Sequence, residues 1–89
     1  MEHEKVKRLK QIIIDKFNPG LSVEELDDNM PLVDYGIGLD SVANMELILE
    51  IEKYLGIEID ESDINSEILY SFRSLKKYLE SLTEKSTNE

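Results

Sequence analysis

Among the residues that could do chemistry, Ser41 stands out by its position. It follows Asp40 and precedes Val42, at the expected start of an acidic, amphipathic helix. Backbone N–H groups and the helix dipole favour negative charge at a helix N-terminus. A hydroxyl at that point is well placed to carry a phosphate ester. The pattern therefore indicates that Ser41 is a point of covalent attachment.

The rest of the chain excludes most kinds of catalytic site. It has no cysteine and a single histidine, His3, so we expect no disulfide, no thiolate, no ordinary zinc site and no general base within reach of Ser41. The acidic stretch 60–65 lacks the glycine and the closing glutamate of a calcium loop, and Gly36 and Gly38 lack the remaining spacing of a phosphate loop. We predict no catalytic residue and no metal site, hence a protein on which other enzymes act.

The charge of the chain is large and unevenly placed. The 89 residues carry a formal net charge of −10. Between residues 40 and 67, Lys53 is the only basic residue among many acids, whereas the first 20 residues are net basic. A strongly negative surface repels nucleic acid and anionic lipid and attracts basic partners. We therefore expect basic protein partners, and neither nucleic acid nor a membrane.

The apolar spacing predicts an all-α fold in a single domain. Helical periodicity marks a first helix over 4–17, stopped by the Asn-Pro-Gly sequence at 18–20. Residues 22–25 have a capping-box pattern and predict a brief helical turn. The segment 27–40 predicts a packed loop with five apolar anchors: Met30, Leu32, Val33, Ile37 and Leu39.

Asp40 is the expected N-cap of a second helix that runs to about Leu55 and is closed by Gly56. Residues 57–59 then predict an extended connector, followed by a short helical piece near 61–69 capped by Asp60. A last helix starts after Ser71 and ends near Leu82. The expected fold is a small bundle of three main helices plus one short helix over residues 1–82, with a frayed polar tail at 83–89. No apolar run is long enough for a membrane span or a secretory signal, so we expect a cytoplasmic monomer.

The helix after Ser41 has two apolar faces. One stripe has the spacing of a core face and consists of Asn44, Leu47, Ile48, Ile51 and Leu55. A bundle helix needs only one such stripe, yet Val42, Met45 and Leu49 lie opposite, with Glu46, Glu50 and Glu52 around them. An apolar centre with a charged edge is typical of a protein-docking surface. The alternative is that Val42 and Leu49 pack beneath the long loop.

The segment 38–42, Gly-Leu-Asp-Ser-Val, resembles the attachment motif of the acyl and peptidyl carrier proteins. The resemblance to this family covers nearly the whole chain. Other segments with family counterparts are the Pro-Leu pair at 31–32, the Glu-Leu pair at 46–47, the 57–59 connector and the Ser71–Leu75 segment. In that family, the serine is esterified with 4′-phosphopantetheine. The resemblance implies that a phosphopantetheinyl transferase modifies Ser41 with coenzyme A, and that the thiol of the arm then holds an acyl or aminoacyl group.

The resemblance also implies partners and a docking surface. Asp40, Val42, Glu46, Leu49 and Glu52 match positions at which family members meet basic patches on their partners. Such partners include an acyl-activating ligase and enzymes of the ketosynthase or acyltransferase type. Ala43 stands where housekeeping fatty-acid carriers usually have an acid, and Lys53 replaces a common acid. These differences suggest a specialised carrier with dedicated partners.

Three hypotheses follow from the sequence. The first is a discrete acyl carrier in a specialised fatty-acid or polyketide-like pathway. The second is an aminoacyl or peptidyl carrier, suggested by the Ser-Glu pair at 66–67 and the Ser-Phe pair at 71–72. The third is an acidic helical adapter in which Asp40 and Ser41 only cap a helix.

Overall fold

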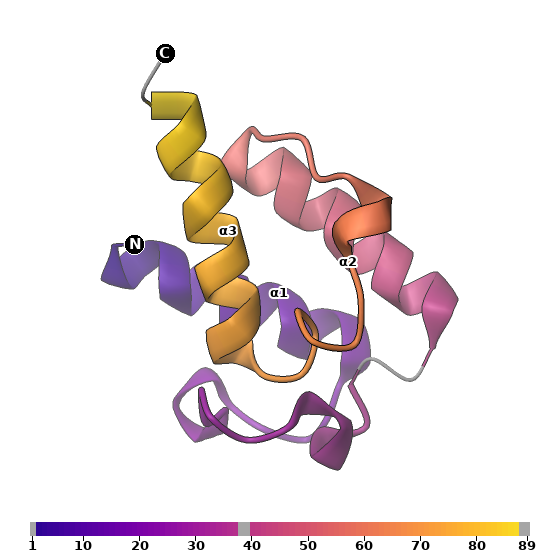
Figure 1. The fold of residues 1–89 in the computed structure, drawn as a ribbon. Coiled ribbons are helices and arrows are strands. Elements are labelled where there is room, and N and C mark those ends of the chain that lie inside the picture. Colours follow the sequence, from indigo (N-terminus) through magenta and orange to yellow (C-terminus); the bar gives the residue numbers. More distant parts are fainter. Residues whose placement is uncertain (1, 38–39, 88–89) are drawn as a thin grey trace.

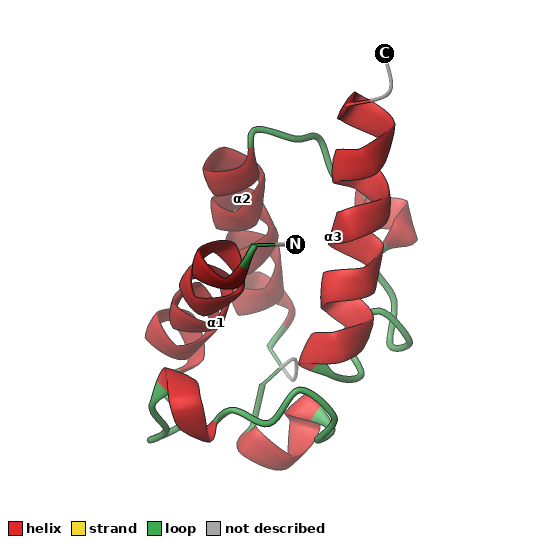
Figure 2. Ribbon diagram, turned by 90° about the vertical axis from the view of Figure 1, so that its left-hand side faces the viewer, coloured by secondary structure: helices red, strands yellow, loops and turns green. Residues whose placement is uncertain are grey.

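The computed structural model describes residues 2–37 and 40–87, without the side chains of 84–87. In this part of the chain, the α-helices are α1 (His3–Phe17), α2 (Ser41–Leu55) and α3 (Phe72–Thr87). Three 3₁₀ turns join them: η1 (Val23–Glu25), η2 (Leu32–Tyr35) and η3 (Glu61–Asp63). Figures 1 and 2 show the three helices around a common centre, with the α1–α2 connection across one end. The all-α fold class is confirmed.

The core lies where the three helices meet. Each helix contributes apolar residues at helical spacing, and Leu9, Ile13, Ile51, Leu75 and Leu79 have no exposed surface. On α2, Leu47, Ile48 and Ile51 are buried and Asn44 and Leu55 are half-buried. The core stripe expected for this helix is thus confirmed. Within the described residues, no helix is both long and apolar enough to cross a membrane.

The loop between α1 and α2 is packed, but by fewer anchors than we expected. Leu32 and Ile37 are buried, as is Leu26. Met30 and Val33, in contrast, are 40% and 52% exposed, so the prediction that they anchor the loop was wrong. Periodicity cannot assign a direction to a side chain in an irregular segment, because successive residues there follow no fixed rotation. Leu39, the fifth anchor, lies outside the described residues.

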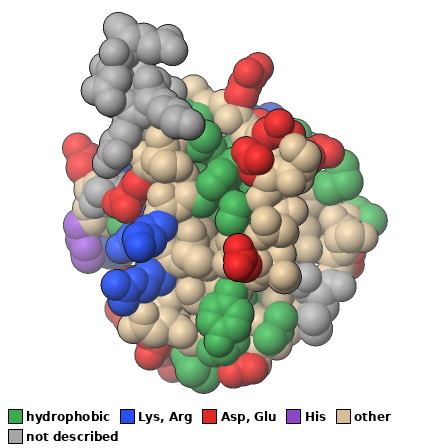
Figure 3. Space-filling view, viewed as in Figure 1, with side chains coloured by type: hydrophobic (Ala, Val, Ile, Leu, Met, Phe, Trp, Pro, Cys, Tyr) green, Lys and Arg blue, Asp and Glu red, His purple; other side chains and the backbone are tan. Residues whose placement is uncertain are grey.

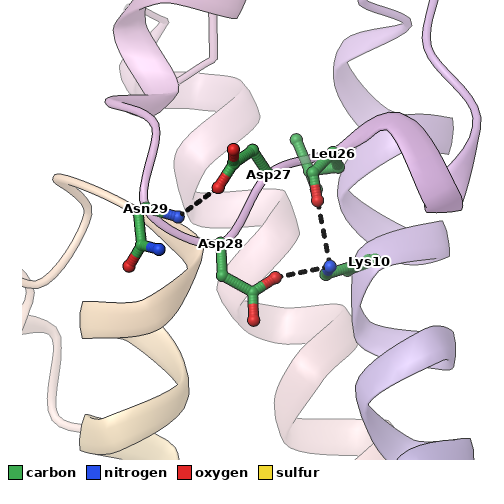
Figure 4. Close-up of polar contacts among 5 residues, drawn as sticks. All are labelled: Lys10, Leu26, Asp27, Asp28 and Asn29. Atoms are coloured by element: carbon green, nitrogen blue, oxygen red, sulfur yellow. Dashed lines mark hydrogen bonds and ion pairs between the residues drawn. The ribbon is translucent and has the colours of Figure 1, made fainter.

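Lys10 on α1 holds this loop against the centre of the molecule (Figure 4). Its Nζ atom forms an ion pair with Asp28 and donates a hydrogen bond to the backbone oxygen of Leu26, at 2.9 Å. The same ammonium lies 5.2 Å from the centre of the Phe72 ring, at the start of α3. One half-buried lysine therefore joins α1, the loop and α3.

The loop is also paired with the segment that precedes α3. The backbone N–H of Leu32 donates to the carbonyl oxygen of Tyr70 at 2.7 Å, and Pro31 and Ser71 form an isolated antiparallel bridge. The backbone N–H of Arg73 donates to the carbonyl oxygen of Asp28 at 3.0 Å. These bonds fix the position of residues 28–33 relative to residues 70–73.

The segment between α2 and α3 is less helical than expected. The 57–59 connector is extended, as predicted, but the 3₁₀ turn after Asp60 covers only residues 61–63 rather than 61–69. The Asn65 side chain accepts hydrogen bonds from the backbone N–H groups of Glu67 and Ile68, both at 3.0 Å. Asn65 thus starts a separate turn, because its side chain competes with the backbone for these donors.

The third helix is longer than expected. Ser71 precedes it as predicted, and its Oγ atom accepts a hydrogen bond from the backbone N–H of Ser74 at 3.2 Å. The helix continues to Thr87, however, five residues past the expected end at Leu82. Helical backbone therefore extends into the segment that we expected to be frayed. The domain boundary at residue 82 stays a prediction.

Candidate prosthetic-group attachment site

Ser41 is the first residue of α2 and is exposed to solvent. The helix starts there because the Asp40 carboxylate accepts hydrogen bonds from the backbone N–H groups of Val42 and Ala43, at 2.9 and 3.3 Å. The N-cap predicted at Asp40 is confirmed. This carboxylate also occupies two of the N–H groups that would otherwise face a bound anion. The start of α2 is therefore capped by Asp40, with the Ser41 side chain exposed to solvent.

Ser41 stands at the edge of a hollow of about 540 Å³, which we call the Ser41 pocket. Its wall on α2 comes from residues 41–48, and the opposite wall comes from residues 61–70, with Val33 at one side. The aliphatic lining residues are Val33, Met45, Ile48, Ile64 and Leu69; the others are Ser41, Asn44, Glu61, Asn65, Ser66 and Tyr70. The volume lies within the roughly 300–1,000 Å³ of small-molecule pockets.

Hydrogen bonds to α2 and α3 hold the 59–70 segment, which contains this wall, in place. The hydroxyl of Tyr78 donates to Asp63 at 3.2 Å, and the Ser74 hydroxyl donates to the carbonyl oxygen of Ile68 at 2.8 Å. Burial and then the hydrogen bond to Asp63 raise the pKa of Tyr78 above its ordinary value. At the start of the segment, the backbone N–H of Ile59 donates to Glu52 at 2.7 Å. The wall is thus attached to both α2 and α3.

The apolar residues of the predicted docking surface lie on the outside of α2. Val42, Met45 and Leu49 are 66%, 53% and 52% exposed, so the alternative that Val42 and Leu49 pack under the loop is wrong. Met45 also lines the Ser41 pocket.

The carboxylates of that surface differ in their surroundings. Asp40 and Glu46 are exposed, and Glu50 lies 3.6 Å from Lys16 of α1. Glu52 is half-buried and accepts the hydrogen bond from Ile59. Glu52 therefore supports the fold, a role that the sequence did not indicate.

Val33 and Tyr70 are site residues that the sequence did not suggest. Both are exposed, at 52% and 57%, and both line the Ser41 pocket. They lie far apart in the chain, and the bonds between residues 31–32 and 70–71 join the segments that carry them. No local pattern could have linked them to Ser41. Gly38 and Leu39 of the attachment motif lie outside the described residues.

Basic side chains gather on one part of the surface. In Figure 3, Lys and Arg side chains (blue) lie mainly at the left, whereas Asp and Glu side chains (red) lie beside them and over the rest of this face. Arg73, Lys76 and Lys77 of α3 line one shallow hollow together with Asp28, Asn29 and Glu80. The acids of residues 40–67 thus lie on elements other than this basic stretch of α3.

Comparison with known protein families identifies the family of this chain. The model of the phosphopantetheine attachment site matches residues 7–80. The chain belongs to the acyl carrier protein family. Carrier proteins of this family hold phosphopantetheine as their prosthetic group, and the family resemblance inferred from the sequence is confirmed.

Individual carrier proteins agree with this assignment. The chain is 36% identical over 61 residues to an acyl carrier protein of Desulforapulum autotrophicum, which covers 68% of this chain and 77% of that protein. It is also 39% identical over 75 residues to the non-reducing polyketide synthase ascC of Acremonium egyptiacum. That match covers 84% of this chain but only 3% of the synthase, so the likeness concerns one small part of a long protein.

Two solved structures have the same carrier fold. The holo acyl carrier protein of Nitrosomonas europaea superposes with a TM-score of 0.73 at 26% identity, over 91% of this chain and 95% of that one. The second is the crystal structure of an engineered Bradyrhizobium japonicum glycine–carrier protein ligase with a carrier protein from Agrobacterium tumefaciens and ATP. Its matching chain has a TM-score of 0.62 at 25% identity, over 84% of this chain and 96% of that chain.

Proposed function

We propose that this carrier protein bears 4′-phosphopantetheine on Ser41 and shuttles acyl intermediates between enzymes of a specialised fatty-acid or polyketide-like pathway. The observation that carries the proposal is the position of Ser41, exposed at the start of α2 and at the edge of a largely aliphatic pocket. When bound, the prosthetic group supplies a terminal thiol that holds the cargo as a thioester. The protein presents the serine, and partner enzymes carry out the reactions.

The residues around Ser41 suit such a group. Aliphatic side chains of the Ser41 pocket can cover methylene groups of the arm or of its cargo, and burial of apolar surface stabilises that contact by about 25 cal/mol per Å². Asn65 and Ser66 at the opposite wall add polar groups, which suit the amides of the arm. The pocket is thus a place where cargo can be sheltered from water between partners.

The proposed docking surface for partner enzymes is the outer face of α2. It combines exposed Val42, Met45 and Leu49 with the carboxylates of Asp40, Glu46 and Glu50. Glu52 contributes charge, although the hydrogen bond to Ile59 limits its movement. Long-range attraction of basic patches speeds encounter, and a small contact area allows rapid release. The partners we propose are a phosphopantetheinyl transferase, an acyl-activating ligase, and enzymes of the ketosynthase or acyltransferase type.

The decisive experiment is the intact mass of the apo protein before and after incubation with coenzyme A and a broad-specificity phosphopantetheinyl transferase. We expect a gain of one phosphopantetheinyl group, which Ser41→Ala abolishes. Ser66→Ala is the matched control, because Ser66 is another exposed serine that lines the same pocket, and it should be modified normally. If the folded wild-type protein gains no mass with several transferases, the adapter hypothesis replaces this one.

A second candidate cargo is an amino acid. The likeness to a chain in the structure of a glycine–carrier protein ligase with its carrier favours it, whereas the acyl carrier and polyketide synthase relatives favour an acyl group. Loading of the phosphopantetheinylated protein distinguishes the two. An acyl-activating ligase should charge an acyl carrier, and an adenylating amino-acid enzyme should charge an aminoacyl carrier.

A further inference from the structure

Three of the apolar side chains that line the Ser41 pocket are exposed to solvent. Val33 comes from the loop before α2, Met45 from α2, and Tyr70 from the segment before α3. Each is more than half exposed. A group of exposed apolar side chains around a concave site is typical of an interaction surface. We call these three residues the pocket rim.

The backbone holds the rim firmly although its members are distant in sequence. Leu32, next to Val33, donates its N–H to the carbonyl oxygen of Tyr70 at 2.7 Å. Met45 follows the first turn of α2, whose N-terminus is fixed by Asp40. Because these bonds already fix the backbone, a partner that covers the rim would order little more than side chains, which lowers the entropic cost of binding.

The charges near the rim indicate the chemistry of what covers it. Asp34 follows Val33 and is exposed, Glu61 lines the pocket, and Glu67 is exposed on the opposite wall. A complementary surface therefore has an apolar centre surrounded by lysine or arginine. Such complementarity favours correct encounter and orientation.

We propose that the pocket rim, and Val33 and Tyr70 in particular, forms a contact surface for the phosphopantetheinyl transferase that modifies Ser41. This inference rests on the proposed function. The transferase must bring its reacting atoms to the Ser41 hydroxyl itself, which lines the same pocket as Val33 and Tyr70. Among the proposed partners, the transferase is the one whose reaction takes place at the Ser41 hydroxyl, so it is the partner that must come closest to the rim. Met45 belongs both to the rim and to the proposed docking surface on α2.

The test compares apo variants as substrates of a purified phosphopantetheinyl transferase with coenzyme A. Tyr70→Ala and Val33→Asp should each raise KM for the carrier about tenfold, with kcat within about twofold. The first removes an aromatic contact and the second places a charge in an apolar contact, and a tenfold change corresponds to about 1.4 kcal/mol of binding. Tyr54→Ala is the matched control, since Tyr54 is 40% exposed on α2 but does not line the pocket. Its KM should equal that of the wild type.

A milder substitution separates contact from folding. Val33→Thr keeps the shape of the side chain and should raise KM about threefold, with an unchanged circular dichroism spectrum. Wild-type KM values for Val33→Asp and Tyr70→Ala would overturn the pocket rim as a contact surface and leave the carrier function intact. Failure of the wild-type protein itself to be modified at Ser41 would instead overturn the proposed function.

Discussion

Asp40 connects the loop to the helix that presents Ser41. Its side chain accepts hydrogen bonds from the N–H groups of Val42 and Ala43, and its backbone oxygen accepts from Asn44 at 2.9 Å. The residue before Ser41 is therefore a structural N-cap as well as a negative charge near the proposed docking surface. Substitutions at Asp40 can separate these two roles, because asparagine caps a helix as well as aspartate does.

We expect Asp40→Ala to lower the free energy of unfolding by about 1 kcal/mol, since the cap is lost. Asp40→Asn should stay within about 0.5 kcal/mol of the wild type. Urea unfolding followed by circular dichroism measures both values. Equal stability of the alanine and asparagine variants would show that the hydrogen bonds to Val42 and Ala43 contribute little.

At the scale of elements, the connector after α2 depends on Glu52. Its carboxylate accepts the Ile59 N–H at 2.7 Å and so binds the start of the 59–70 segment to the side of α2. Ile59 itself is buried, whereas Glu58 and Asp60 on either side are exposed. A carboxylate that accepts from a backbone N–H makes a charge-assisted hydrogen bond, which is stronger than a neutral one. The wall opposite Ser41 is thus positioned by a residue on the same helix as the serine.

Glu52→Ala should lower the free energy of unfolding by about 1–2 kcal/mol, because the backbone N–H of the buried residue Ile59 loses its hydrogen-bond acceptor. Glu46→Ala is the matched control: it removes the same charge from the same helix at an exposed position and should change stability by less than about 0.5 kcal/mol. Denaturant unfolding provides the comparison. If both variants lose the same amount, net charge and not the hydrogen bond explains the effect.

At the scale of the whole molecule, Lys10 joins segments that are far apart in the chain. Its ammonium contacts Asp28, the carbonyl oxygen of Leu26 and the Phe72 ring. The loop held in this way continues to Val33 at the pocket rim, and the bridge between Pro31 and Ser71 closes the same end of the bundle. The contacts of Lys10 therefore act together with the backbone bonds of this region to fix how the loop and α3 meet beside the site.

Lys10→Met should lower the free energy of unfolding by about 1–2 kcal/mol, because the side chain keeps its apolar packing but loses its polar contacts and its attraction to the Phe72 ring. Lys7→Met, at an exposed position of the same helix, should have little effect. Thermal unfolding of the two variants tests this. A Lys10→Met variant as stable as Lys7→Met would contradict the role of the cluster.

Local patterns in the sequence were sufficient to predict α1, α2, the start of α3 and the position of Ser41 at the start of α2. The apolar spacing of α1 and α2, the Asp40 cap and the end of α2 at Gly56 are all properties of neighbouring residues. The same holds for the two faces of α2, because a regular helix fixes the direction of each side chain. The motif around Ser41 likewise predicted the family, which the match over residues 7–80 confirmed.

Only the tertiary structure decided what surrounds Ser41. Val33, expected to anchor the loop, is exposed and lines the Ser41 pocket together with Tyr70. Glu52, expected on the docking surface, accepts a hydrogen bond from Ile59. In the irregular segments 27–37 and 57–71 the direction of each side chain depends on contacts with residues distant in the chain, such as those of Lys10 with Asp28 and of Leu32 with Tyr70. The sequence alone thus determined α1, α2 and the position of Ser41 at the start of α2, because short-range periodicity and capping encode them. The pocket exists only once long-range hydrogen bonds and packing bring three separate segments together.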